Sequence, residues 1–185
     1  KGKGNTGFTT TLHTLVDVFQ GIGGANPSIK NILNYIISEK EGLHNNPEEV
    51  LKNTSYIRDY IKGSEKKITL FGEKKMKEGG SVFVFGSGQF ISKILKRARS
   101  NGKTFEVHNT EMRPSFQGRK LAGELAKGGI SINHYADNSL KKAIRSTDLV
   151  LCECVSVLSN GEVIGDQGFE LVADVARGEG VPLYV

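Results

Sequence analysis

The stretch SVFVFGSGQFISKILKRA, residues 81–98, decides the fold of this chain. Its segment Val82–Phe85 is a continuous apolar run, which is typical of a strand buried on both faces of a parallel sheet. Gly86, Ser87 and Gly88 then interrupt the run. The apolar residues that follow recur at helical spacing, with basic residues between them: Phe90, Ile91, Ile94 and Leu95. The order strand, glycine turn and helix predicts the beginning of a doubly wound α/β domain.

The glycine turn has two interpretations. A turn between a buried strand and a helix aims backbone N–H groups at the space above the strand end, where a phosphate is the usual ligand. Alternatively, the glycines only let the chain reverse, because GSG lacks the third glycine of the dinucleotide fingerprint. Both interpretations stay open, and Gly86, Ser87 and Gly88 are candidate phosphate-binding residues.

The composition is typical of a globular protein in water. Of the 185 residues, 37% are hydrophobic and 24% are charged. No apolar run approaches the ~20 residues that cross a bilayer. The stretch 1–19 has spaced apolar residues, and so it lacks the continuous apolar core of a signal peptide. We therefore expect a cytoplasmic protein with no membrane contact.

The net charge of +5 is spread evenly along the chain. Residues 1–80 contain 12 basic and 9 acidic side chains, and residues 81–185 contain 13 and 11. The denser basic runs, 74–77 and 93–103, have no aromatic residues on which bases could stack. This pattern disfavours direct nucleic-acid binding and suits a phosphorylated ligand or an acidic partner surface.

The two cysteines do not make a metal site. Cys152 and Cys154 lie one residue apart and supply only two of the four ligands that a structural zinc ion requires. The four histidines are scattered without ligand spacing. We expect both cysteines to be small core residues, and we expect no metal or other cofactor.

Residues 1–78 are expected to form a helical subdomain. An amphipathic pattern predicts a helix over 9–19, and Ser28 is expected to cap a second helix. Asn46 as cap and Pro47 at the first helical position predict a third. A last helix is expected to carry Ile68, Leu70, Phe71 and Met76.

Residues 79–185 are expected to form a Rossmann-like α/β domain with a parallel sheet, because strand and helix patterns alternate. Further strands are predicted at 105–108, 130–135, 148–154 and 181–185, and helices at 117–127, 139–145 and 168–177. Asn160 and Gly161 predict a hairpin turn. The chain stops on a strand that we expect to be interior, so we expect a domain truncated at its C-terminus.

The richest polar stretch is TEMRPSFQGRKL, residues 110–121, which directly follows a predicted strand. It should lie at the carboxyl edge of the sheet, beside the glycine turn. Glu111 can accept hydrogen bonds from sugar hydroxyls, Arg113 and Arg119 can hold phosphate, and Gln117 adds an amide. Alternatively, Arg113 only pairs with Glu111 at the surface, and Arg119 lies on a solvated helix face.

Two stretches resemble a known family. They are EMRPSFQGRKLAGELA and SNGEVIGDQGFELVADVARGEGVPLYV. They are similar to the family that joins the alpha, beta and delta subunits of translation initiation factor 2B, their archaeal relatives, and the isomerases of ribose-1,5-bisphosphate and methylthioribose-1-phosphate. The family blocks E-T-R-P…Q-G-x-x-L, G-A-D/E…N-G…N-K-I-G-T and P-x-Y-V are matched in part. The resemblance covers residues 68–185 well and implies further C-terminal strands used in dimerisation.

The resemblance implies that an isomerase of this family uses a cysteine after the first strand and the aspartate of the G-A-D block. Such a pair moves protons over a bound phosphosugar. Here the cysteine position falls on Phe85 or Gly86, and the aspartate position falls on Val155. None of these side chains can exchange protons. Glu153 and Asp166 remain weak catalytic candidates.

The resemblance therefore implies a non-catalytic regulatory or assembly subunit with a vestigial phosphosugar or nucleotide pocket. Its expected partners are copies of itself or related subunits, and translation initiation factor 2. The expected ligand-binding residues are those of the glycine turn together with Glu111, Arg113, Gln117 and Arg119. The alternative is an aldose–ketose isomerase with relocated acid/base residues. A third hypothesis is a generic nucleotide- or RNA-binding α/β module.

Overall fold

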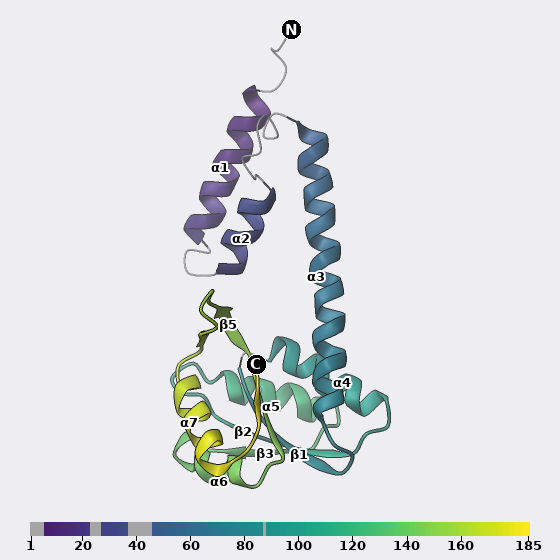
Figure 1. Ribbon diagram of the computed structural model, residues 1–185, viewed down its shortest axis with the longest axis vertical. Coiled ribbons are helices and arrows are strands. Elements are labelled where there is room, and N and C mark those ends of the chain that lie inside the picture. The colour runs from purple at the N-terminus through teal and green to yellow at the C-terminus, as the bar shows by residue number, and fades with distance from the viewer. Residues whose placement is uncertain (1–5, 23–26, 37–45, 87) are drawn as a thin grey trace. The chain divides into compact units, whose positions relative to one another are not determined.

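The computed structural model describes residues 6–22, 27–36, 46–86 and 88–185 (Figure 1). The chain divides into two compact units, residues 1–64 and residues 65–185. Each unit is described by itself.

The first unit is helical, as predicted. It contains α1 (Thr6–Ile22), α2 (Pro27–Ile36) and the first part of α3 (Pro47–Lys75). Asn46 caps α3, because its Oδ1 accepts a hydrogen bond from the Glu48 backbone N–H at 3.1 Å. The predicted cap at Ser28 is wrong: α2 already begins at Pro27, so Ser28 lies inside its first turn.

The prediction of a separate last helix is also wrong. The chain continues as one helix from Pro47 to Lys75, through Gly63. An added Cβ on Gly63 would meet nothing within 4 Å. A single glycine costs only about 1 kcal/mol in a helix interior, which is too little to end a helix of this length.

The second unit is an α/β domain around a parallel sheet, as predicted (Figure 1). The sheet has the order β3-β2-β1-β4-β7. Its strands are β1 (Gly80–Phe85), β2 (Phe105–Thr110), β3 (Ile132–Tyr135), β4 (Leu149–Cys152) and β7 (Leu183–Tyr184). The crossing helices are α4 (Gln89–Ser100), α5 (Gln117–Lys127), α6 (Leu140–Arg145) and α7 (Phe169–Glu179), and a short 3₁₀ turn, η2 (Asp137–Ser139), precedes α6.

The side chains of β1 divide the core into two layers. Val82 and Val84 belong to a cluster with the apolar residues of α4 and α5. Phe83 and Phe85 point to the other face and belong to a cluster with the apolar residues of α6 and α7. Because β1 is covered on both faces, its continuous apolar sequence is explained.

Two predicted strands differ from the structure. The segment 148–154 is not one strand: β4 ends at Cys152, and β5 (Cys154–Val157) leaves the sheet to form an antiparallel hairpin with β6 (Val163–Gly165). The last predicted strand, 181–185, is the shorter, two-residue β7, which pairs in parallel with β4. None of the described helices is long and apolar enough to cross a membrane.

Candidate functional site

The candidate site lies where three neighbouring strands end. The chain leaves β1 at Gly86, β4 at Glu153 and β2 at Glu111. These strands are adjacent and parallel, so the three residues share the carboxyl edge of the sheet. The connections reverse direction between β1 and β4, and such a switch point is where open α/β sheets bind their ligands.

The glycine turn requires its glycines. Gly86 has φ 145°, and a Cβ built there would lie 2.6 Å from Cβ of Glu153. Gly88 has φ 94° at the N-cap of α4, and its Cβ would lie 2.8 Å from Cδ1 of Leu121. A side chain at either position would be strained and would collide with a neighbour. Ser87, the third predicted residue, lies outside the described residues.

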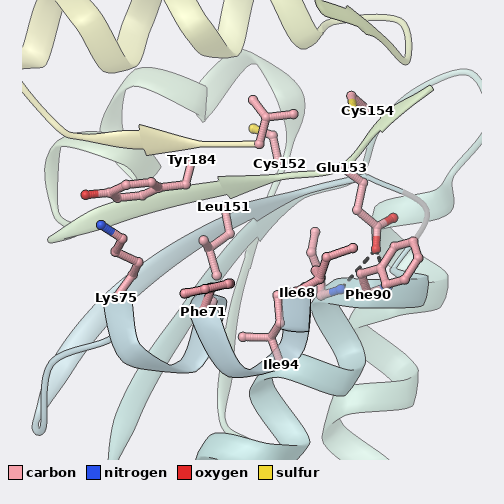
Figure 2. Close-up of a pocket in the computed structure, with 13 residues that line it drawn as sticks. Ile68, Phe71, Lys75, Phe90, Ile94, Leu151, Cys152, Glu153, Cys154 and Tyr184 are labelled. Carbon is pink, nitrogen blue, oxygen red and sulfur yellow. Dashed lines mark hydrogen bonds between the residues drawn. The ribbon is translucent and has the colours of Figure 1, made fainter. Parts of the chain in front are cut away.

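The N–H groups after this turn already have an acceptor. The Glu153 carboxylate accepts hydrogen bonds from the backbone N–H groups of Gly88 at 2.8 Å, Phe90 at 2.5 Å and Ile91 at 3.0 Å. Figure 2 shows the Glu153 side chain reaching from the end of β4 toward Phe90. A carboxylate from the chain itself therefore lies at the N-terminus of α4, where an anion is electrostatically favoured.

Sequence reasoning considered Glu153 only as a weak catalytic candidate and missed this role. A signal was present. In the G-A-D block, the glycine lies two residues before the aspartate, and that position is Glu153 when the aspartate falls on Val155. A glutamate in place of a glycine beside a glycine turn places a charged side chain where the family block has none.

Glu111, Arg113 and Arg119 form one ionic cluster. Glu111 accepts hydrogen bonds from Nε of Arg113 at 2.9 Å and from Nε of Arg119 at 3.0 Å, and Arg119 Nη2 also contacts it. Hydrogen bonds from Arg119, and then from Arg113, lower the pKa of Glu111 to about 2. The surface pairing of Arg113 with Glu111 is therefore present, and it extends to Arg119.

The two arginines also share one aromatic ring. The guanidinium carbons of Arg113 and Arg119 lie 4.9 and 4.5 Å from the centre of the Phe116 ring. Their side chains are 61% and 51% exposed, whereas that of Glu111 is 14% exposed. A single carboxylate thus faces two cations, and the cluster keeps one net positive charge at the surface.

The loop that carries this cluster is held by its backbone. The carboxylate of Asp137, in η2, accepts hydrogen bonds from the N–H groups of Met112 at 2.8 Å and Arg113 at 2.9 Å. Asn109 donates a hydrogen bond to the carbonyl oxygen of Gly118 at 2.7 Å. Gln117 is the first residue of α5. The predicted loop residues are therefore ordered at this edge of the sheet.

The positions at which the resemblance implies proton transfer carry apolar groups. Phe85 is 4% exposed, and a Cβ built on Gly168 would lie 3.3 Å from its ring. Val155 is on β5 and 41% exposed. Asp166 is exposed, just before α7.

The two cysteines remain protonated at neutral pH. Burial raises the pKa of Cys152 to about 12, and burial also raises the pKa of Cys154. Neither thiol is then a ready nucleophile, because the thiolate is the reactive form. Among the described residues, no group of three acidic, histidine or cysteine side chains could hold a metal ion.

An apolar pocket of about 400 Å³, which sequence reasoning missed, lies beside Glu153 in the second unit (Figure 2). Its walls come from the last turns of α3, from α4, and from the ends of β4 and β7. Lys75 Nζ lies 4.5 Å from the centre of the Tyr184 ring at its rim. These walls combine segments far apart in sequence, so no local motif could reveal the pocket.

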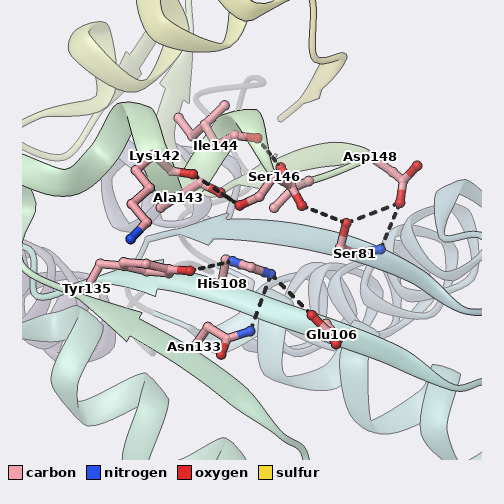
Figure 3. A network of polar contacts seen from close by, with 11 residues as sticks. Ser81, Glu106, His108, Asn133, Tyr135, Lys142, Ala143, Ile144, Ser146 and Asp148 are labelled. Carbon is pink, nitrogen blue, oxygen red and sulfur yellow. Dashed lines mark hydrogen bonds and ion pairs between the residues drawn. The ribbon is translucent and has the colours of Figure 1, made fainter.

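A second polar cluster joins the neighbouring strands β2 and β3, on a face of the sheet and away from the carboxyl ends of β1 and β4 (Figure 3). His108 is 4% exposed. Its Nδ1 lies 3.2 Å from the Tyr135 hydroxyl, and its Nε2 lies 3.4 Å from Asn133 Nδ2 and 3.7 Å from Glu106. Burial lowers the pKa of His108, and Glu106 offsets part of that effect. This cluster connects the two strands and faces no described pocket.

Known proteins similar to this chain include enzymes and translation factors. A sequence model of the initiation factor 2 subunit family matches residues 6–185. The chain is 27% identical over 159 residues to ribose 1,5-bisphosphate isomerase of Archaeoglobus fulgidus, covering 85% of this chain and 51% of that protein. It is 26% identical over 164 residues to translation initiation factor eIF2B subunit delta of Dictyostelium discoideum, covering 85% of this chain and 26% of that protein.

The fold is also that of a solved translation factor. The structure of translation initiation factor eIF-2B of Pyrococcus horikoshii OT3 matches with a TM-score of 0.84 at 19% identity, covering 96% of this chain and 63% of that chain. The chain spans about half the length of the curated isomerases that it matches. The family match extends over almost the whole chain, across both units. The chain therefore belongs to the initiation factor 2 subunit family.

Proposed function

We propose that this chain is a non-catalytic, cytoplasmic member of the family that acts through assembly with itself or with related subunits. The observation that carries the proposal is the absence of a proton-transferring side chain at the two positions of the implied acid/base pair, which fall on Phe85 or Gly86 and on Val155. Isomerisation of a phosphosugar moves protons between adjacent carbons and needs acid/base groups placed against the substrate. A phenyl ring, a glycine and an isopropyl group cannot supply them.

The ionisable groups nearby do not replace the missing pair. Cys152 and Cys154 are thiols at neutral pH, because burial raises the pKa of both. Both carboxylate oxygens of Glu153 accept backbone hydrogen bonds: Oε2 accepts one from Gly88 in the turn, and Oε1 accepts those from Phe90 and Ile91 in α4. This arrangement favours a structural role for Glu153 over a role as general base.

The predicted ligand residues then form a vestigial phosphosugar or nucleotide pocket. They are Gly86, Ser87, Gly88, Glu111, Arg113, Gln117 and Arg119. Assembly is supported by the Dictyostelium relative, whose name makes it a subunit of a larger factor. The partners that we propose are related subunits and translation initiation factor 2.

An aldose–ketose isomerase is the second candidate. It is favoured by the similarity to curated ribose 1,5-bisphosphate isomerases, three of which are 27–31% identical over 157–159 residues. In that case Glu153 or Asp166 would have to transfer the protons.

A turnover assay separates the two candidates. The chain is incubated with ribose-1,5-bisphosphate or with methylthioribose-1-phosphate, and ketose formation is measured. We expect no turnover above the protein-free control with either substrate. Turnover by the wild-type chain that Glu153→Gln or Asp166→Asn abolishes would overturn the proposal.

A further inference from the structure

We propose that Glu153 is a specificity-determining residue, whose carboxylate takes the place of a ligand's phosphate at the glycine turn and excludes phosphorylated ligands from it. This inference rests on the proposed function, since it explains why the pocket is vestigial. It concerns the exclusion of ligands and is independent of assembly.

The contacts of Glu153 are those that a bound phosphate would make. Three backbone donors, the N–H groups of Gly88 in the turn and of Phe90 and Ile91 in the first turn of α4, converge on its two carboxylate oxygens within 3.0 Å. These first N–H groups of a helix have no partner within the helix. Glu153 uses the anion-binding capacity that the turn creates.

The Glu153 side chain also occupies the space beside the glycine turn that a phosphate would need. The Cβ that Gly86 lacks would lie 2.6 Å from Cβ of Glu153 and 3.0 Å from its Oε2. The side chain therefore packs directly against the backbone of the turn. A phosphate could approach these donors only after Glu153 had left them.

A free phosphate competes poorly with this carboxylate. Glu153 is part of the chain, so its binding to the turn does not cost the translational freedom that a free ligand loses. Its backbone N–H is also fixed, because it donates to the carbonyl oxygen of Phe85 at 2.9 Å. An incoming phosphate would in addition meet the repulsion of a like charge.

The arginine pair, which is the second candidate site for an anion, is likewise occupied by a carboxylate of the chain itself. Arg113 and Arg119, which could hold another phosphate, both face Glu111. Two carboxylates of the chain thus lie at the two places where the sequence predicted ligand anions. Glu153 is the one whose removal frees backbone donors.

The test is a titration with inorganic phosphate at constant ionic strength, followed by ¹H–¹⁵N NMR of the whole chain. The readout is the amide signals of Gly88, Phe90 and Ile91. In the wild-type chain we expect these signals to stay in place. In Glu153→Gly we expect them to shift and saturate, because the variant frees the donors and the space. Glu162→Gly, which removes an exposed glutamate from the turn of the β5–β6 hairpin, is the matched control and should behave as wild type.

Two results would overturn the inference. One is saturable shifts of the three amides in the wild-type chain. The other is a folded Glu153→Gly variant in which the amide signals of Gly88, Phe90 and Ile91 do not shift when phosphate is added. If that variant does not fold, Glu153→Gln takes its place: it keeps the volume, removes the charge, and is expected to show weaker saturable shifts that the wild type lacks. Phosphate binding by the wild type would leave the assembly proposal standing, because the turnover assay tests that separately.

Discussion

At the scale of single residues, the edge of the sheet satisfies its own charges. Glu153 is bound by the first N–H groups of α4, and Glu111 is bound by Arg113 and Arg119. Here the polar groups of the candidate site mainly stabilise the turn and the loop that carry them.

Gly118 is the residue at which a small change should do most damage. A Cβ there would lie 1.8 Å from the carbonyl oxygen of Thr110, which is backbone and cannot turn aside. Gly118→Ala should lower the free energy of unfolding by about 3 kcal/mol, as overpacking does. Gly123→Ala in the same helix is the control: its Cβ meets nothing, so it should add about 0.5–1 kcal/mol. Urea unfolding measures both, and equal effects would contradict the packing described for Gly118.

The Glu111 cluster predicts a dependence of stability on acid. The pKa of Glu111 is lowered from 4.5 to about 2 in the folded chain, by Arg119 first and Arg113 second. The contribution of ionised Glu111 to the free energy of unfolding is therefore complete above pH 4.5. It is lost as the pH falls toward 2, because the unfolded chain binds the proton first. Glu111→Gln should remove this part of the pH profile of the melting temperature. If Glu111→Gln and the surface variant Glu162→Gln show the same profile, the cluster does not stabilise the fold.

At the scale of elements, local sequence patterns correctly predicted those helix and strand ends that depend on nearby residues. The bounds 117–127 of α5 agree with the structure, because its periodicity ends at a glycine pair. The end of β4 was missed, because the turn at Glu153 depends on donors in α4, more than sixty residues away in the chain. The arginine loop was correctly placed after β2, but the sequence left open whether the arginines hold Glu111 or a ligand.

The continuous helix α3 predicts a stabilising substitution. Gly63 lies in its interior, where an alanine would meet nothing within 4 Å. Gly63→Ala should therefore raise the free energy of unfolding by about 0.5–1 kcal/mol, measured by circular dichroism in urea. A loss of stability would instead show that residue 63 is not helical and that two helices meet there.

The His108 cluster predicts a second dependence on pH. Burial lowers the pKa of this histidine below its ordinary 6.5, so the unfolded chain binds a proton that the folded chain does not. Stability should be complete above pH 6.5 and should fall as the pH decreases through that value. His108→Gln should weaken the decrease of the melting temperature that the wild-type chain shows as the pH falls below 6.5. The exposed His13 is the control: if His13→Gln flattens the profile equally, the effect does not arise from burial between β2 and β3.

At the scale of the whole molecule, the isomerases among the relatives and the residues of the candidate site favour different functions. The scaffold is that of the initiation factor 2 subunit family, with a parallel sheet, a switch point and a glycine turn. The relatives of this chain include ribose 1,5-bisphosphate isomerases. The two positions at which the resemblance implies an acid/base pair fall on Phe85 or Gly86 and on Val155. Under the proposed function, the chain keeps the fold without the isomerase chemistry and acts by holding other subunits in place.

Assembly of this chain into a larger particle is tested most directly by the mass of that particle. The chain is co-expressed with other members of the initiation factor 2 subunit family from the same organism. It is then purified through a tag, and the mass of the particle is measured by native mass spectrometry. We predict a defined particle that contains several copies of the chain, or the chain with at least one related subunit. A mass of 20.1 kDa, that of one chain, at every concentration and with every related subunit would contradict the central claim.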